Sequence, residues 1–86
     1  MLKQLILMWC KENRKKKEKL EAFWKLEDRD GSVTMKDLAS EIGEIIATTY
    51  LWRRYCMENG IIEHLPDASI YNITDFGKTL IGVENE

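Results

Sequence analysis

Cys10, Cys56 and His64 are the residues of this chain whose side chains most readily bind metals or act as nucleophiles. The two cysteines lie far apart and form no CxxC motif, and with one histidine they cannot supply the four ligands of a structural zinc site. The sequence shows no nucleophile–base pair and no glycine-rich phosphate loop. We therefore expect a protein that is not an enzyme, binds no metal or other cofactor, and keeps both cysteines reduced as packing residues.

Basic residues gather near the start of the chain, and the chemistry they suit is the binding of phosphate. Residues 1–25 hold eight Lys or Arg and three Glu, a charge of +5, whereas residues 26–86 hold five Lys or Arg and twelve Asp or Glu, a charge of −7. Six cations fall between Lys11 and Lys19, and on a helix some of them must face outward. The run suits the neutralisation of several phosphates, or it forms a solvated helix face that keeps the domain soluble.

Length and composition indicate one small globular domain. The chain has 86 residues, of which 44% are hydrophobic and 33% charged, and it contains one proline. The apolar run of residues 1–10 is too short for a signal peptide, and no stretch approaches the ~20 apolar residues of a membrane span. We expect a cytoplasmic protein with no membrane partner.

The elements that position these residues begin with helical periodicity over residues 2–28. The apolar faces before and after the basic run are in rough register, which favours one helix, or two nearly collinear helices that meet near Asn13. Residues 1–19 are interpreted as an N-terminal helical extension and residues 20–86 as the domain proper. The extension is either an extra core helix or a dimerisation helix, and the residues expected at the dimer interface are Leu2, Leu5, Ile6 and Trp9.

Turn and cap residues divide the rest of the chain into short elements. Thr34 and Thr74 are typical helix N-caps, and Gly43 and Gly60 are typical of helix ends. The expected order is a turn at 28–32, a short strand at 32–34, a helix at 35–42, a helix from 45–47 to about 59, strands at 61–65 and 70–73 around a turn at 66–69, and a final short helix with Leu80 and Ile81 facing inward.

Three segments in this order carry a resemblance to a known family: residues 38–43, 59–63 and 71–78. Leu38-Ala39-Ser40-Glu41-Ile42-Gly43 and the later Asn59-Gly60-Ile61-Ile62-Glu63 look like the helix-turn-helix core of small winged-helix repressors of the MarR and PadR kind. Tyr71-Asn72-Ile73-Thr74-Asp75-Phe76-Gly77-Lys78 resembles the segment that closes the wing of such proteins. The resemblance covers roughly residues 20–81. It implies an α+β fold, mostly α, that is a winged helix-turn-helix with an extended N-terminal helix and a short two-stranded wing.

The resemblance also implies a function, the binding of double-stranded DNA by a homodimer that regulates transcription. Residues 46–59 would form the recognition helix in the major groove, with half-sites about one helical turn apart. Placing Trp52 at the centre of its buried face puts Ile45, Thr49, Cys56 and Asn59 nearby and turns Ala47, Tyr50, Arg54 and Met57 outward, with Arg53 at the edge. The expected DNA-binding residues are Lys36, Ala47, Thr48, Tyr50, Arg53 and Arg54, joined by Arg14, Lys15 and Lys17 of the basic run.

Other interpretations of the same residues stay open. Arg53 and Arg54 suit a solvated surface as well, paired with Glu58 or Glu63. The acidic later part of the chain suits a winged helix that contacts a protein partner and not DNA. Residues 27–37 resemble a calcium-binding EF-hand loop, but its first ligand position falls on Leu26, which has no side-chain oxygen.

Overall fold

The protein is an α+β fold dominated by helices, as expected from the sequence. A computed structural model describes residues 2–66 and 69–83, without the side chain of Leu2. In these residues the elements are α1 (Leu2–Glu12), α2 (Arg14–Asp30), α3 (Met35–Ile42), α4 (Ile46–Glu58), β1 (Ile62–His64), β2 (Tyr71–Ile73) and α5 (Asp75–Leu80). No helix in this part of the chain has both the length and the apolar character needed to cross a bilayer.

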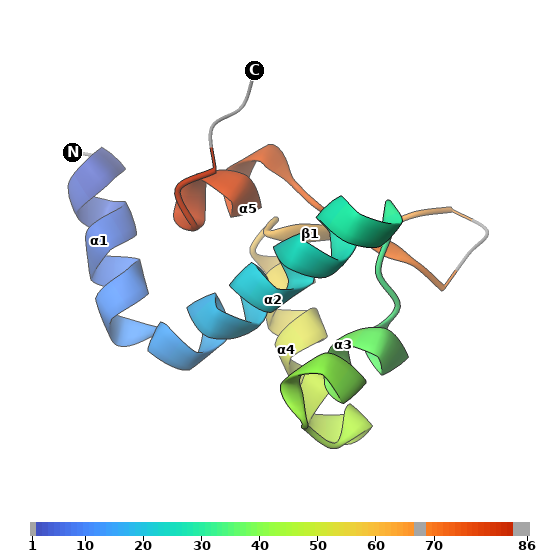
Figure 1. Ribbon diagram of the computed structural model, residues 1–86. Helices are drawn as coiled ribbons and strands as arrows, with labels where there is room; N and C mark the ends of the chain where they lie inside the picture. Colours follow the sequence, from blue (N-terminus) through green and yellow to red (C-terminus); the bar gives the residue numbers. More distant parts are fainter. Residues whose placement is uncertain (1, 67–68, 84–86) are drawn as a thin grey trace.

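The N-terminal region consists of two helices that meet at a sharp bend, so the expectation of one helix or a collinear pair is wrong (Figure 1). Asn13 leaves the helical conformation, with φ −122° and ψ 43°. Its side-chain amide donates to the carbonyl oxygen of Trp9 at 3.0 Å, and its backbone N–H donates to the same oxygen at 2.8 Å. The bend turns α1 back towards α5. The expected boundary between residues 19 and 20 lies within α2, whereas the chain changes direction at Asn13.

The core lies between α2, α3, α4 and the β-hairpin. Phe23 of α2 packs against Trp52 of α4, with ring centroids 5.9 Å apart, and Trp52 Nε1 donates to the carbonyl oxygen of Lys16 at 3.3 Å. Buried apolar side chains from the helices, the hairpin and the segments that join them complete this core: Leu20, Leu26, Val33, Leu38, Cys56, Ile61, Ile62, Tyr71, Ile73 and Leu80. The helical spacing of Leu20, Phe23 and Leu26 is what makes α2 the central helix.

Capping residues set the bounds of α3 as the sequence predicts. The side-chain oxygen of Thr34 accepts from the backbone N–H of Asp37 at 3.0 Å and starts α3. Gly43 ends α3 in the left-handed conformation, with φ 65°, which a residue with a Cβ rarely adopts. After this turn α4 begins at Ile46, and it ends at Glu58, close to the expected residue 59.

The β-hairpin is antiparallel and pairs Ile62 with Ile73 and His64 with Tyr71. Both strands are shorter than expected, but Leu65 N–H still donates to the carbonyl oxygen of Ile70 at 3.0 Å beyond them. The short strand expected at 32–34 is a single bridge between Val33 and Tyr71. Of the turn expected at 66–69, residues 67–68 lie outside the described residues.

Two side chains join the hairpin to the helices around it. Glu27 of α2 accepts the backbone N–H of Ile73 on its Oε1 at 2.6 Å. Thr74 caps α5, since its hydroxyl oxygen accepts from Gly77 N–H at 3.0 Å, and it also donates to the Ile61 carbonyl at 2.9 Å. The base of the hairpin is thus held on both sides.

Candidate functional site

Helix α4 presents one face to the core and a broad opposite face to solvent. Thr49, Trp52 and Cys56 are buried, as the helical phase predicts. The outward face is formed by Ala47, Tyr50, Leu51, Arg54 and Met57, which are all exposed. Four of these five side chains were expected on this face, and Leu51 was not singled out.

Two residues assigned to the buried face of α4 are exposed, and this part of the prediction is wrong. Ile45 is 72% exposed and Asn59 is exposed. Both are cap residues: Ile45 is extended, with φ −69° and ψ 145°, and Asn59 has φ −101° and ψ 8°. The 100° step of the α-helix does not apply at such positions, so a helical projection misplaces their side chains.

Arg53 and Arg54 are neighbours in sequence with different surroundings. Arg54 is exposed, and its Nε lies 3.0 Å from Glu58 Oε1 in an ion pair one turn apart, one of the two partners considered for it. Arg53 is half-buried and turns back to the hairpin, where its Nη1 donates to the hydroxyl of Tyr71 at 2.7 Å. The guanidinium also lies over the ring of Tyr50, 4.9 Å from its centroid.

The basic run and the start of α4 face the same open groove. Lys15, Lys16 and Lys19 of α2 line it from one side, and Thr48, Leu51 and Trp52 of α4 line it from the other; its volume is about 290 Å³. Lys15 and Thr48 are the lining residues that the sequence predicts at the DNA-binding surface, but nothing local to either residue shows that they are adjacent.

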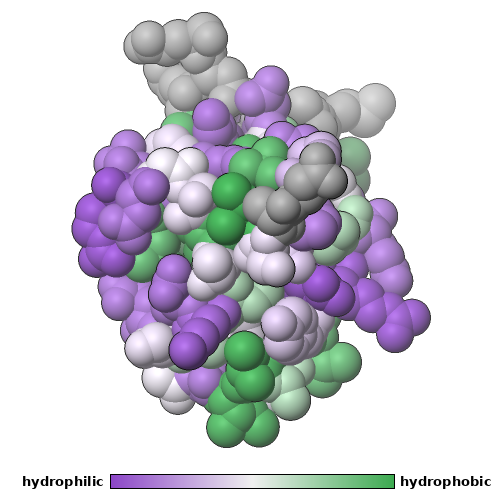
Figure 2. Space-filling model, turned by 90° about the vertical axis from the view of Figure 1, so that its right-hand side faces the viewer, coloured by the Kyte–Doolittle hydropathy of each residue, from purple (hydrophilic) through white to green (hydrophobic). Residues whose placement is uncertain are grey.

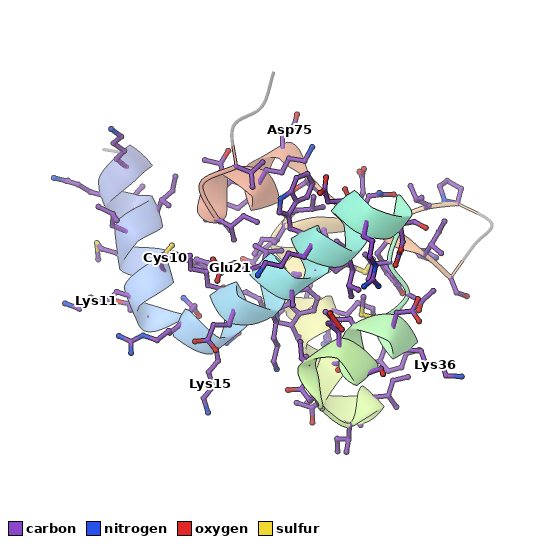
Figure 3. All side chains as sticks on the ribbon, in the orientation of Figure 1. Cys10, Lys11, Lys15, Glu21, Lys36 and Asp75 are labelled. Carbon is purple, nitrogen blue, oxygen red and sulfur yellow. The ribbon has the colours of Figure 1, made fainter. Side chains whose placement is uncertain are left out.

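The lysines that line this groove differ in their exposure and in the side chains that they contact. Lys19 Nζ lies 2.7 Å from Glu44 Oε2, and both side chains are 20% exposed. Lys16 Nζ lies over the ring of Tyr55, 4.9 Å from its centroid. Lys15 is exposed, and no ion pair is found for it within residues 2–66 and 69–83. Figure 3 shows Lys15 pointing away from the ribbon into solvent. Lys15 is therefore the cation of this groove best placed to meet a ligand.

The other basic residues expected at the site lie around its edge. Arg14 and Lys36 are exposed, and Lys17 is half-buried. Figure 3 places Lys36 on α3, on the other side of the α3–α4 pair from Lys15. The basic residues expected at the site are thus spread over α2, α3 and α4.

Exposed apolar side chains surround the α3–α4 turn, a feature that the sequence analysis missed. Ile45 is 72% exposed, Ile46 44% and Leu51 69%. Figure 2 shows apolar surface at the lower end of the molecule, the end at which Figure 1 draws this turn. Leu51 follows the period of the helix and was identifiable from its position opposite the buried face, whereas Ile45 and Ile46 depend on the cap geometry.

Helix α1 has its own apolar surface, which differs from the expected interface residues. Ile6 and Trp9 pack against the core, and Trp9 Nε1 donates to the hydroxyl of Tyr55 at 2.9 Å. The apolar side chains that remain exposed in the described part of α1 are Leu5, Leu7 and Met8, and Leu2 has no described side chain. Between α1 and α5 lies an apolar groove of about 230 Å³, lined by Leu5, Ile6, Trp9, Phe76 and Leu80.

The geometry around residues 27–37 differs from that of a calcium loop. Helix α2 continues through Asp30, so the residues expected at the first ligand positions are helical. Glu27 is bound to the hairpin backbone, and the carboxylate of Asp30 is hydrogen-bonded by Arg29 at 3.0 Å, which lowers the pKa of Asp30. Within the described part of the chain, no three His, Cys, Asp or Glu side chains gather closely enough to hold a metal.

Both cysteines are free thiols. Cys10 Sγ donates to the carbonyl oxygen of Leu80 at 3.3 Å, which helps to hold α1 near α5. Cys56 is buried in the core. Each thiol has a packing role of the kind expected from the sequence.

No protein-family model, no curated protein and no solved structure matches this chain.

Proposed function

We propose that this protein is a winged helix-turn-helix regulator that binds double-stranded DNA through α4. In this proposal α3 and α4 are the helix-turn-helix pair, α4 is the recognition helix and the β1–β2 hairpin is the wing. The outward face of α4 is long enough to reach base edges in a major groove, since thirteen residues span about 20 Å. Cytoplasmic localisation belongs to the same proposal.

The observation that carries the proposal is the groove shared by α2 and α4. It brings Lys15 of the basic run beside Thr48 and Leu51 at the start of α4. A helix seated in the major groove has phosphates on both sides, and Lys15 and Lys36 flank α4 where such phosphates would run (Figure 3). Ala47 and Tyr50 are exposed on α4 and would meet the base edges and the sugar–phosphate backbone.

We propose further that the protein acts as a homodimer held by α1. Leu5 and Met8 are exposed on α1 beside the groove that ends at Phe76. A second copy offers the same helix and the same groove, so one two-fold contact covers both surfaces at once. Ile6 and Trp9 pack α1 against the protein's own core. In the proposed dimer the contact with the second copy is therefore made by Leu5, Met8 and Phe76.

A second candidate function is a winged helix that binds a protein partner. The observation in its favour is the apolar surface of Ile45, Ile46 and Leu51 at the end of α4 that would enter the DNA. Aliphatic side chains contact thymine methyl groups, but they also suit a protein interface. This candidate predicts no affinity for DNA at moderate salt.

The test is the fluorescence anisotropy of a labelled mixed-sequence DNA duplex, titrated with the protein at about 50 and 200 mM salt. We expect binding that weakens steeply as salt rises, because phosphate contacts release counterions. Lys15→Gln should lower the slope of log K against log salt by about one unit. Lys25→Gln is the matched control, since Lys25 is an exposed lysine of α2 outside the groove, and it should keep the wild-type slope.

The titration of the wild-type protein is enough to distinguish the DNA-binding function from the protein-binding one. No binding even at the lower salt would contradict the DNA proposal and favour the protein partner. Binding in which Lys15→Gln and Lys25→Gln behave alike would keep DNA as the ligand and would remove the α2–α4 groove from the site.

A further inference from the structure

Arg53 sits in a cluster that connects α4 to both strands of the hairpin. Its Nη1 donates to the Tyr71 hydroxyl at 2.7 Å, and its guanidinium carbon lies 4.9 Å from the ring centroid of Tyr50 and 5.9 Å from that of Tyr71. The ring of His64 on β1 lies against the ring of Tyr71, with the two centroids 4.8 Å apart. A planar guanidinium between two aromatic rings is a geometry that lysine cannot reproduce.

The burial of this side chain shows which of its groups a ligand can reach. Arg53 Nε is shielded from solvent and has no hydrogen-bond partner among the described residues. No carboxylate in that part of the chain forms an ion pair with Arg53, so its charge is stabilised by the rings and by the Tyr71 hydroxyl. Of the five N–H donors of the guanidinium, the one on Nε is shielded and one on Nη1 is engaged by Tyr71, which restricts the pairs of donors that can meet a base edge.

We infer that Arg53 is a positioning residue that locks the β1–β2 hairpin onto α4, and that Arg54 is the arginine of this pair that contacts DNA. The inference rests on the proposed function for its second half only. We call the Arg53–Tyr71 contact the lock. Tyr71 is its central residue, because it also pairs with Val33 through two backbone hydrogen bonds of 2.8 and 3.1 Å. The Arg53–Tyr71 bond therefore links α4 to the hairpin and to the segment before α3.

The lock sets the angle between the wing and the recognition helix. Packing fixes the inner part of the hairpin, since β1 lies against α4 in the shared core and Glu27 and Thr74 hold the base of the hairpin to α2 and α5. The Arg53–Tyr71 hydrogen bond adds a side-chain link between α4 and β2. Without the Arg53–Tyr71 hydrogen bond, the outer part of the hairpin is free to change its angle relative to α4. DNA binding must then order it, and the conformational entropy lost at that step weakens the affinity for DNA.

The test uses the 86-residue chain with Tyr71→Phe, Arg53→Lys, the double variant of these two, and Arg53→Gln; Arg54→Gln is the matched arginine control. Tyr71→Phe keeps the buried ring and removes only the hydroxyl that accepts from Arg53. Amide hydrogen exchange is measured at the hairpin and at α2 and α3, and DNA affinity is measured at several salt concentrations.

We expect faster exchange of the hairpin amides in Tyr71→Phe and Arg53→Lys, with α2 and α3 unchanged. DNA binding should weaken roughly fivefold in each, the scale of a lost charge-assisted hydrogen bond, with an unchanged salt slope. The double variant should be no weaker than the single ones, because the two residues form one interaction. Arg54→Gln should leave hairpin exchange unchanged and lower the salt slope or the sequence preference.

Two results would overturn the inference. One is wild-type hairpin exchange in both Tyr71→Phe and Arg53→Lys, which would show that no lock exists. The other is a lower salt slope in an Arg53→Gln variant whose hairpin exchange is normal, which would make Arg53 a phosphate contact. If the wild-type protein binds no DNA, the proposed function fails, and the exchange data alone still decide whether Arg53 holds the hairpin.

Discussion

The chemistry of Cys56 is set by its burial. The side chain is 1% exposed, and desolvation of the thiolate raises the pKa of this thiol to about 12, with smaller opposing effects from Lys16 and Lys19. The thiolate is the reactive form, so this cysteine is inert in the folded protein at neutral pH.

We predict that a thiol reagent such as a disulfide dye at pH 8 modifies Cys56 only after unfolding, whereas the half-buried Cys10 reacts in the native state. The number of thiols that react before and after addition of denaturant checks this, with Cys10→Ala as the control that should leave no native reaction. Fast native modification in Cys10→Ala would contradict the burial of Cys56.

The same raised pKa has a consequence for stability. A group whose pKa is higher in the folded state stabilises the fold fully below its unfolded value, here 9.0, and loses that contribution as pH rises towards the folded value of about 12. Denaturant unfolding between pH 8 and 11 should therefore show a steeper alkaline loss for the wild type than for Cys56→Ala. Parallel curves would show that Cys56 has no part in the loss.

At the scale of elements, α5 packs against the base of the hairpin at Gly77, a position with no room for a side chain. Gly77 is buried, and a Cβ added there would overlap the carbonyl oxygen of Ile61 and lie 2.7 Å from Cγ1 of Ile73. The hairpin backbone therefore approaches α5 as closely as glycine permits.

We predict that Gly77→Ala lowers the free energy of unfolding by roughly 1–3 kcal/mol, the range of an overpacked core, although alanine has the higher helix propensity. Thr79→Ala, in the same helix, is the control, and it removes only a local bond to the Asp75 carbonyl. Chemical denaturation of both variants checks this. A Gly77→Ala variant as stable as wild type would mean that α5 can move away from the hairpin.

Helices α1 and α2 show how an element can be predicted while its direction is not. The helical period on both sides of Asn13 is real, and both segments are helical. The bend between them depends on Trp9 reaching Tyr55, 46 residues away, and on Cys10 reaching Leu80. Periodicity is a local signal and carries no information on such contacts.

At the scale of the whole molecule, the proposed homodimer rests on the apolar groove between α1 and α5. We predict that the wild-type protein has about twice its 10.1 kDa chain mass in solution and that Leu5→Lys converts it to a monomer. A buried lysine without a partner opposes association. Light scattering coupled to size-exclusion chromatography measures both masses.

Leu51→Lys is the control, since Leu51 is as exposed as Leu5 but lies on α4. It should leave the mass unchanged. A monomeric wild type, or a Leu5→Lys variant that stays dimeric, would contradict the interface. Point substitution is a sharper test than removal of α1, because Ile6 and Trp9 also cover the protein's own core.

The sequence alone determined the order of the elements from α3 to α5, the caps at Thr34 and Thr74, and the burial of Thr49, Trp52 and Cys56 on α4. These features depend on residues one to four positions apart, whose preferences act before the chain has a tertiary structure. Only the tertiary structure decided the bend at Asn13, the groove that joins Lys15 to α4, and the different surroundings of Arg53 and Arg54. Each of these depends on partners distant in the chain, such as Tyr71, 18 residues from Arg53, and only packing brings such residues together.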